Sequence, residues 1–216
     1  MSWRIIKKTS LIFLSVIGIT VLIIASRLGY NFFSSNVHTV IPSEIYRTAQ
    51  LDKAGLHKYT KQLDVKTIIN LRGVWKNDHW YQVESQFVKK NNINYYPMQF
   101  SAYELPSKQE LRDLVQLLET APKPIMFHCE GGADRTGMAG AISIILFDKN
   151  PSMTKIMRQA SWHYNAISSR TVGYQVMRNY FAWLKANRYR SSTKKRFLEW
   201  LDLPVEMKPY HGWFVV

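Results

Sequence analysis

Apolar residues are most concentrated in one uncharged run near the N-terminus, where residues 11–25 read LIFLSVIGITVLIIA. Counting the neighbouring Thr9, Ser10 and Ser26, this stretch reaches the lower length limit for a membrane-spanning helix. A cleaved signal peptide has an apolar region of similar length, but its cleavage site requires small residues at the −1 and −3 positions. Cleavage after Ala25 or after Ser26 would place an isoleucine at −3. We therefore favour an uncleaved membrane anchor over residues 1–27.

The charges that flank this run predict its orientation. Arg4, Lys7 and Lys8 precede it, whereas Arg27 follows it closely. Basic residues concentrate on the cytoplasmic side of a span, so we expect a cytoplasmic N-terminus. The rest of the chain would then lie on the extracytoplasmic side, which is the periplasm in a Gram-negative bacterium.

After the anchor, strand-like and helix-like patterns alternate. We interpret residues 28–43 as a linker, 44–190 as a catalytic domain and 191–216 as a basic and apolar C-terminal extension. Short β-branched or apolar runs predict strands at 44–47, 65–71, 94–98 and 125–129. Helical spacing predicts helices at 53–63, 79–90, 107–120, 136–147, 152–164 and 171–187, the third with the capping-box pair Ser107 and Glu110. This alternation predicts an α/β fold with a central, mostly parallel sheet flanked by helices, preceded by one transmembrane helix.

Composition and charge limit the classes of partner and site that the chain can have. The chain has 29 basic and 15 acidic residues, for a formal net charge of +14, which favours anionic partners. Aromatic residues lie at core-like spacings without a nucleic-acid-binding motif, so we expect no nucleic-acid partner. The single cysteine, Cys129, excludes an internal disulfide and a CxxC metal site, and we expect no metal.

The residues around Cys129 form the motif with the most chemical content, IMFHCEGGADRTG over 125–137. The apolar strand delivers Cys129 to the carboxyl edge of the sheet, where ligands bind in open α/β folds. Gly131 and Gly132 allow a tight turn, and the helix that begins near Thr136 points its N-terminal N–H groups at the same place. This combination predicts a phosphate-binding cradle. Its members are Glu130, Gly131, Gly132, Ala133, Asp134, Arg135 and Thr136.

The cradle also favours a reactive sulfur. A helix N-terminus and a nearby guanidinium stabilise a thiolate over a thiol, which makes Cys129 a candidate nucleophile. Arg135, six positions later, can grip two phosphate oxygens with its planar fork, and Thr136 can hydrogen-bond the sulfur. We expect His128 to support the cradle by hydrogen bonding rather than to act as a base. The alternative, an inert buried cysteine, does not account for the strand, the glycines and the helix start together.

HCEGGADRTG resembles the signature loop of the cysteine-based protein tyrosine and dual-specificity phosphatase superfamily, in which His-Cys is followed by five residues and Arg. The Asp before the Arg resembles a bacterial subgroup and is shared with myotubularin-type lipid phosphatases. Three other stretches fit the same bacterial pattern: IYRTAQ (45–50), TIINLRG (67–73) and YPM (96–98). The resemblance covers roughly residues 37–187. It implies a two-step reaction through a phosphocysteine, with no metal or organic cofactor.

The resemblance also implies an Asp that protonates the leaving oxygen, on a loop after the 94–98 strand. Here that loop reads MQFSAYEL over 98–105 and contains no Asp. Three candidates remain for the general acid. Asp134 in the cradle ranks first, Glu104 on the loop second and Asp78 third; the alternative for Asp134 is a structural ion pair.

The substrate is the least determined feature. An anchored, basic domain meets membrane substrates at raised local concentration, which favours an envelope lipid or glycolipid phosphate. A phosphoprotein is the runner-up, and a catalytically weak phosphate-binding module is a third interpretation. The basic cluster near the C-terminus, whose members are Arg188, Arg190, Lys194, Lys195 and Arg196, is either a lipid-facing patch or a solvated face.

Overall fold

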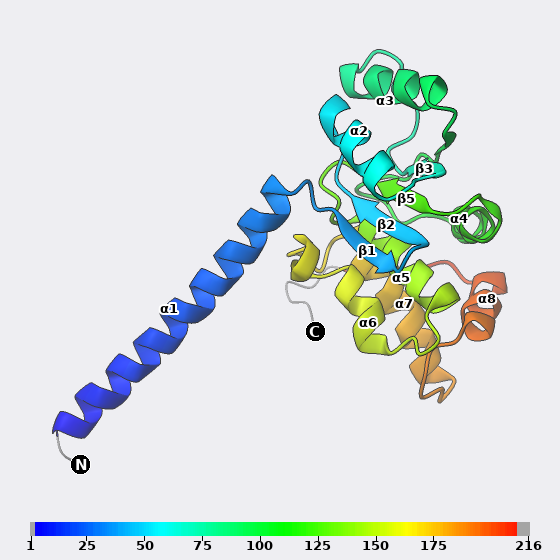
Figure 1. Cartoon of the computed structure of the whole chain (residues 1–216). Helices are drawn as coiled ribbons and strands as arrows, with labels where there is room; N and C mark the ends of the chain where they lie inside the picture. The colour runs from blue at the N-terminus through cyan, green and yellow to red at the C-terminus, as the bar shows by residue number, and fades with distance from the viewer. Residues whose placement is uncertain (1–2, 211–216) are drawn as a thin grey trace.

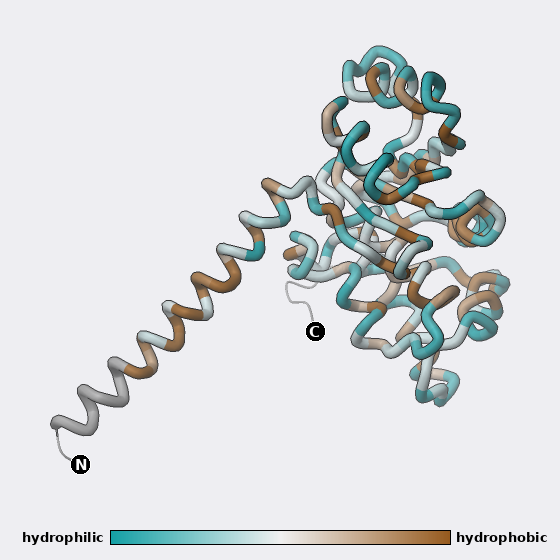
Figure 2. The backbone as a smooth tube through the Cα atoms, in the orientation of Figure 1, coloured by the Kyte–Doolittle hydropathy of each residue, from teal (hydrophilic) through white to brown (hydrophobic). Residues whose placement is uncertain are grey.

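The computed structural model describes residues 3–210, and the side chains of residues 12–210. Helix α1 (Trp3–Phe33) projects from one side of the remaining, compactly folded chain (Figure 1). Within the described residues one helix, Ile12–Phe33, is long and apolar enough to cross a membrane, although an N-terminal signal sequence passes the same test. Figure 2 shows the hydrophobic stretch along α1, where residues such as Ile12, Phe13 and Leu22 are about two-thirds exposed.

A five-stranded mixed sheet forms the centre of the fold. Its order is β1-β2-β5-β3-β4, and its members are β1 (His38–Ile41), β2 (Ile45–Thr48), β3 (Thr67–Asn70), β4 (Asn94–Pro97) and β5 (Ile125–His128). β1 pairs antiparallel with β2, whereas the pairs β2–β5, β5–β3 and β3–β4 are all parallel. The prediction of an α/β fold with a mostly parallel sheet is therefore confirmed.

Helices cover both faces of the sheet. Successive residues of a strand point to opposite faces, so neighbouring residues of β5 pack against different groups of helices. Met126 of β5 packs in the smaller core with α2 (Lys53–Gln62) and α3 (His79–Lys90). Its neighbours Ile125 and Phe127 point into the larger core. The helices of the larger core are α4 (Lys108–Thr120), α5 (Arg135–Phe147), α6 (Met153–Gln159), α7 (Val172–Ala186) and α8 (Lys194–Asp202). Figure 1 shows the two groups on opposite sides of the sheet.

Most predicted helices form close to their expected bounds. The capping box is present: the Ser107 hydroxyl accepts from the Glu110 N–H, and the Glu110 carboxylate accepts from the Ser107 N–H. The predicted helix over 152–164 is wrong in its second half, because α6 ends at Gln159 and a short 3₁₀ helix, η1 (Trp162–Tyr164), follows.

The prediction of a linker over residues 28–43 is wrong. α1 continues to Phe33, and residues 38–41 form strand β1 at the edge of the sheet. The linker interpretation overlooked HTVI (38–41), whose register is set only by pairing with β2. At the other end, α8 places Phe197, Trp200 and Leu201 in the larger core, so this part of the predicted extension belongs to the packed fold. The apolar tail over 211–216 lies outside the described residues.

Candidate phosphate-binding site

Residues 129–134 form a loop between the carboxyl end of β5 and the first residue of α5. The central position of β5 in the parallel part of the sheet places this loop where ligands bind in open α/β folds. Cys129 begins the loop and is buried, with 3% of its surface exposed. The strand-loop-helix arrangement expected from the sequence is therefore present, with the sulfur at the base of the loop.

The two glycines of the loop are not equivalent. Gly132 has a φ of +65°, and a Cβ there would lie 2.6 Å from the Ala49 N. Gly131 has no such constraint, because a Cβ there would meet nothing within 4 Å. The tight approach of the loop to the segment that follows β2 thus depends on Gly132, and the sequence did not distinguish the two residues.

This difference gives a matched pair of variants. We expect Gly132→Ala to lower the free energy of unfolding by at least about 2 kcal/mol. The new Cβ would clash with the backbone near Ala49, and alanine is strained at a positive φ. Gly131→Ala should change it by less than about 0.5 kcal/mol, as an unconstrained substitution does. Thermal melts of both variants check the prediction, and equal destabilisation would contradict it.

Two buried side chains hold the outer side of the loop. Asn36 lies just beyond α1, and its Nδ2 donates to the Gly131 O at 3.1 Å and to the Gly132 O at 3.0 Å. Arg47 on β2 is fully buried and donates through Nη2 to the Gly132 O at 2.8 Å. With their carbonyl groups engaged on this side, the loop peptides direct N–H groups toward the opposite, inner side.

Arg47 also brings positive charge behind the loop. Its Nη1 donates to the backbone O and the Oε1 of Gln159, both at 2.7 Å, and its guanidinium stacks on Tyr164 at 3.9 Å. Burial lowers the pKa of Arg47 to about 10, against the opposing effect of Tyr164 and Cys129, so it remains cationic at neutral pH. Neither Arg47 nor Arg72 lies on the open surface, because Arg47 is fully buried and the Arg72 side chain is 16% exposed.

His128 links the loop to a buried polar network. Its Nδ1 lies 3.4 Å from the Cys129 O, and its Nε2 lies 3.0 Å from the Glu84 Oε2. Glu84 on α3 also accepts from the Tyr95 hydroxyl at 2.7 Å and from the Gln50 Nε2 at 2.8 Å. Although burial alone would raise the pKa of Glu84, the charge of His128 and these hydrogen bonds together lower it.

The Glu84 carboxylate should stabilise the fold in a pH-dependent way. A carboxyl group with a lowered pKa contributes stability above its unfolded-state pKa, near 4.5, and loses that contribution as pH falls through the folded-state value. We expect Glu84→Gln to cost about 2 kcal/mol at pH 7, because the buried donors of Tyr95 and Gln50 lose a charged acceptor. The difference from the parent should shrink below about pH 4.5. Unfolding measured at both pH values tests this, and a constant difference would contradict it.

The mouth above the loop is a hollow of about 460 Å³. Glu130 lines it from the loop, Arg135 from the first residue of α5, Arg72 and Asp78 from the segment after β3, and Tyr103 from the segment after β4. Cys129, at the base of the loop, is not among the residues that line it. Arg72 stacks on Trp80 at 3.7 Å and contacts the Gln50 Oε1 at 3.2 Å, which fixes its guanidinium beside the loop. Two arginines thus line one opening, and phosphate is the ligand that such a pair suits.

The three candidate acids lie in different places. Asp78 lines the mouth, and its Oδ2 accepts from the Trp80 Nε1 at 3.0 Å. Asp134 is not among the residues that line the mouth. Its Oδ1 accepts from the Gly173 N–H at 2.7 Å, at the start of α7. Burial raises the pKa of Asp134, partly offset by hydrogen bonds from α7. Glu104 is exposed and does not line the mouth either.

Thr136 and Arg135 of the cradle each carry a buried side-chain donor. The Thr136 hydroxyl is fully buried and has no hydrogen-bond partner among the described residues, so the expected bond to the sulfur is not formed. Arg135 also has a buried Nε without a partner there, while its Nη1 lies 3.4 Å from the Phe100 O. Because Arg135 lines the opening, its unpaired donor is available to a ligand.

Sequence reasoning missed Asn36 and Glu84 altogether. Asn36 lies in what looked like a linker, and Glu84 looked like an ordinary acidic residue on a helix. Both are separated in sequence from their partners by tens of residues, and only their burial reveals their roles. Their sequence surroundings gave no signal, because Asn36 directly follows two serines and Glu84 lies on a helix among Gln82, Ser85 and Gln86.

Comparison with protein families decides the assignment. The model described as "DSP-PTPase phosphatase fused to NAD+ Kinase" matches residues 34–162, from the segment that contains Asn36 to the first residue of η1. The chain belongs to this phosphatase family. It is a phosphoric monoester hydrolase of the cysteine-based tyrosine and dual-specificity type. We found no match among curated proteins.

Solved structures share the fold of this phosphatase. The core catalytic domain of the PP-IP phosphatase Siw14 from S. cerevisiae, solved with citrate, is 19% identical with a TM-score of 0.54, covering 73% of this chain and 96% of that one. A mutant form of Tk-PTP is 14% identical with a TM-score of 0.52, covering 70% and 95%. Both have low identity, so they support the architecture rather than a shared substrate.

Proposed function

We propose that this phosphatase hydrolyses phosphate monoesters through a phosphocysteine on Cys129. The sulfur attacks phosphorus, an S–P bond forms and the P–O bond to the leaving group breaks, while an acid protonates the departing oxygen. Water then attacks the phosphorus of the phosphocysteine and gives its proton to the carboxylate left by the acid. The S–P bond breaks, Cys129 leaves as a thiolate and orthophosphate is released. Arg135 and the loop N–H groups stabilise the charge that develops on the phosphoryl oxygens.

The observation that carries this proposal is the way the loop is held from outside. Asn36 and Arg47 occupy the carbonyl oxygens of the loop, which supports a cradle of N–H groups facing the sulfur. Arg47 contributes a buried positive charge that favours an ionised sulfur and a bound dianion. The Thr136 hydroxyl is free to donate to that sulfur.

We infer that Asp78 is the general acid, because it is the candidate on the mouth. Asp78→Asn should slow an alkyl phosphate, which has a poor leaving group, about 10²-fold or more, yet slow p-nitrophenyl phosphate far less. Asp134→Asn should instead lower stability by about 1 kcal/mol, because its carboxylate accepts hydrogen bonds at the start of α7. Steady-state kinetics with both esters separates the residues. The opposite pattern would assign the acid to Asp134, and a leaving-group effect confined to Glu104→Gln would assign it to Glu104.

For the substrate we propose an envelope lipid or glycolipid phosphate. α1 supports this choice, since a domain fixed beside a bilayer meets membrane substrates first. Phosphate release from the full chain in detergent should be compared for phosphatidylglycerophosphate, phosphoinositides, lipopolysaccharide fragments and phosphotyrosine peptides. Preference for the peptides would replace the lipid proposal with a phosphoprotein phosphatase. No release from any substrate or aryl phosphate would favour the phosphate-binding module.

We also propose the extracytoplasmic location of the phosphatase domain, with the N-terminus in the cytoplasm. The flanking charges of α1 support it. A C-terminal reporter that is active only outside the cytoplasm should give a signal. A silent reporter, with a stable fusion on an immunoblot, would reverse the orientation.

A further inference from the structure

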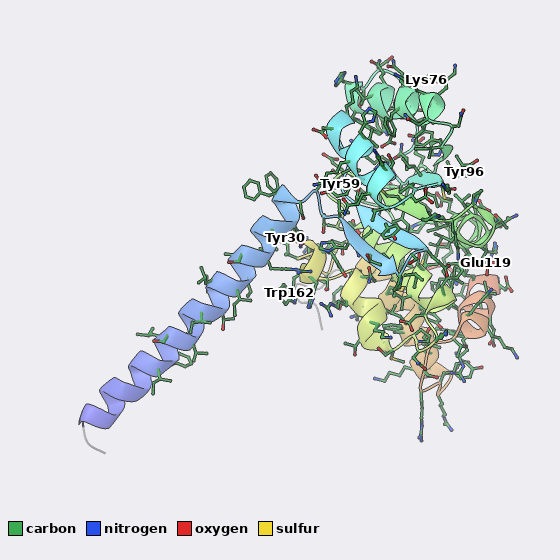
Figure 3. The ribbon with its side chains drawn as sticks, in the orientation of Figure 1. Tyr30, Tyr59, Lys76, Tyr96, Glu119 and Trp162 are labelled. Carbon is green, nitrogen blue, oxygen red and sulfur yellow. The ribbon has the colours of Figure 1, made fainter. Side chains whose placement is uncertain are left out.

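The last turns of α1 are fastened to the segment 158–167, which contains η1. The Arg27 Nε donates to the His163 O at 3.3 Å, and the Asn31 Nδ2 donates to the same oxygen at 2.8 Å. Asn31 Nδ2 also contacts the Asn165 Oδ1 at 2.9 Å. These bonds hold η1 beside the end of α1, as Figure 3 shows for Tyr30 and Trp162. The catalytic domain is thus fixed to the helix rather than tethered by a free linker.

Large apolar side chains are exposed around this junction. Tyr30 is 60% exposed, Trp162 41% and Ile167 71%, and Phe32 and Phe33 at the end of α1 are exposed still further. Tyrosine and tryptophan are enriched where a span meets the headgroup region. A helix from Ile12 to Phe33 is about 33 Å long, close to the thickness of the hydrocarbon core, so its last turns reach that region.

Two arginines bring positive charge to the same junction. Arg27 and Arg158 both act on His163, whose pKa is lowered first by burial and then by these two charges. On α1, Leu22 and Ile23 line a shallow hollow together with Arg27 and Tyr30. Apolar residues near the middle of the helix, followed about one turn later by an arginine, match a phospholipid acyl chain and its anionic headgroup.

We propose that Arg27, Tyr30, Arg158, Trp162 and Ile167 form an interfacial surface that lies on the bilayer and binds anionic phospholipid headgroups. The inference rests on the proposed membrane anchoring. It adds that the domain has a fixed orientation relative to the bilayer, because η1 cannot leave the membrane surface without breaking its hydrogen bonds to α1. Asn36 follows α1 closely and contacts the loop, so the phosphate-binding cradle is held near the bilayer surface.

The test places one label at a time in the full chain. Cys129→Ser removes the only cysteine, and a fluorophore is attached to Ile167→Cys in vesicles of phosphatidylcholine with or without phosphatidylglycerol. Lys76→Cys is the matched aqueous control, because Lys76 is exposed at the end of the domain remote from α1 (Figure 3). Gly18→Cys is the bilayer control, because a side chain there meets nothing within 4 Å.

We expect aqueous iodide to quench the label at 167 at least about threefold less than the label at 76, and the label at 18 least of all. Phosphatidylglycerol should strengthen the protection at 167. Arg158→Gln should reduce that gain about fivefold, the effect of one basic residue near an anionic surface.

The outcomes separate the two proposals. If the label at 18 is protected while the label at 167 is quenched like that at 76, the interfacial surface is overturned and the anchor stands. If phosphatidylglycerol has no effect, or Arg158→Gln leaves its effect intact, headgroup binding through Arg158 is overturned. If the label at 18 is also quenched, the anchor fails and the interfacial surface fails with it.

Discussion

Cys129→Ser should reduce turnover of an aryl phosphate by about 10⁴-fold or more, because a serine hydroxyl at the same place is a far weaker nucleophile. The variant should still bind orthophosphate, since the loop N–H groups and Arg135 remain. Cys129 is 3% exposed, so the substitution also tests whether a sulfur at the base of the loop is reached by substrate.

Steady-state kinetics and phosphate binding by calorimetry check both parts of this prediction. Rapid quench of the parent enzyme with a labelled substrate should trap phosphate on the protein, and Cys129→Ser should trap none. Retained turnover in the serine variant would show that the sulfur is an inert core group. If the variant loses phosphate binding because it does not fold, the thermal melt will show the loss of folding.

Arg135→Lys should lower kcat/KM by about 10³-fold although it preserves the charge. A lysine places a single point charge where the guanidinium offers a planar fork, and the fork matches two phosphoryl oxygens at once. The Arg135 Nε has no partner among residues 12–210, and its Nη1 makes only a 3.4 Å contact with the Phe100 O, which leaves the Arg135 donors available to a ligand. Most of the loss should fall on kcat, because charge on those oxygens grows in the transition state.

Arg72→Lys is the matched control, because Arg72 lines the same mouth but is held by Trp80, Gln50 and Glu130. We expect a change of only about threefold to tenfold, mainly in KM, from the lost stacking and pairing. Equal effects of the two lysine substitutions would contradict a special role for Arg135 and would indicate that both arginines only attract the anion.

The sequence by itself determined the elements whose signals are local. The capping pair Ser107 and Glu110, the apolar run before Cys129 and the glycines after it predicted a helix, a strand and a loop, and each is present. Such signals are readable because neighbouring residues within one turn or one strand decide them. The phosphatase family followed from the same short motif.

Only the tertiary structure decided what surrounds that motif. It turned the expected linker into the end of α1 and strand β1, brought Asn36 and Arg47 behind the loop, and paired Glu84 with His128. It also turned Asp134 toward α7 and placed Asp78 on the mouth. These features join residues far apart in the chain, and their energies depend on burial and on which partner is nearby, neither of which a local pattern contains.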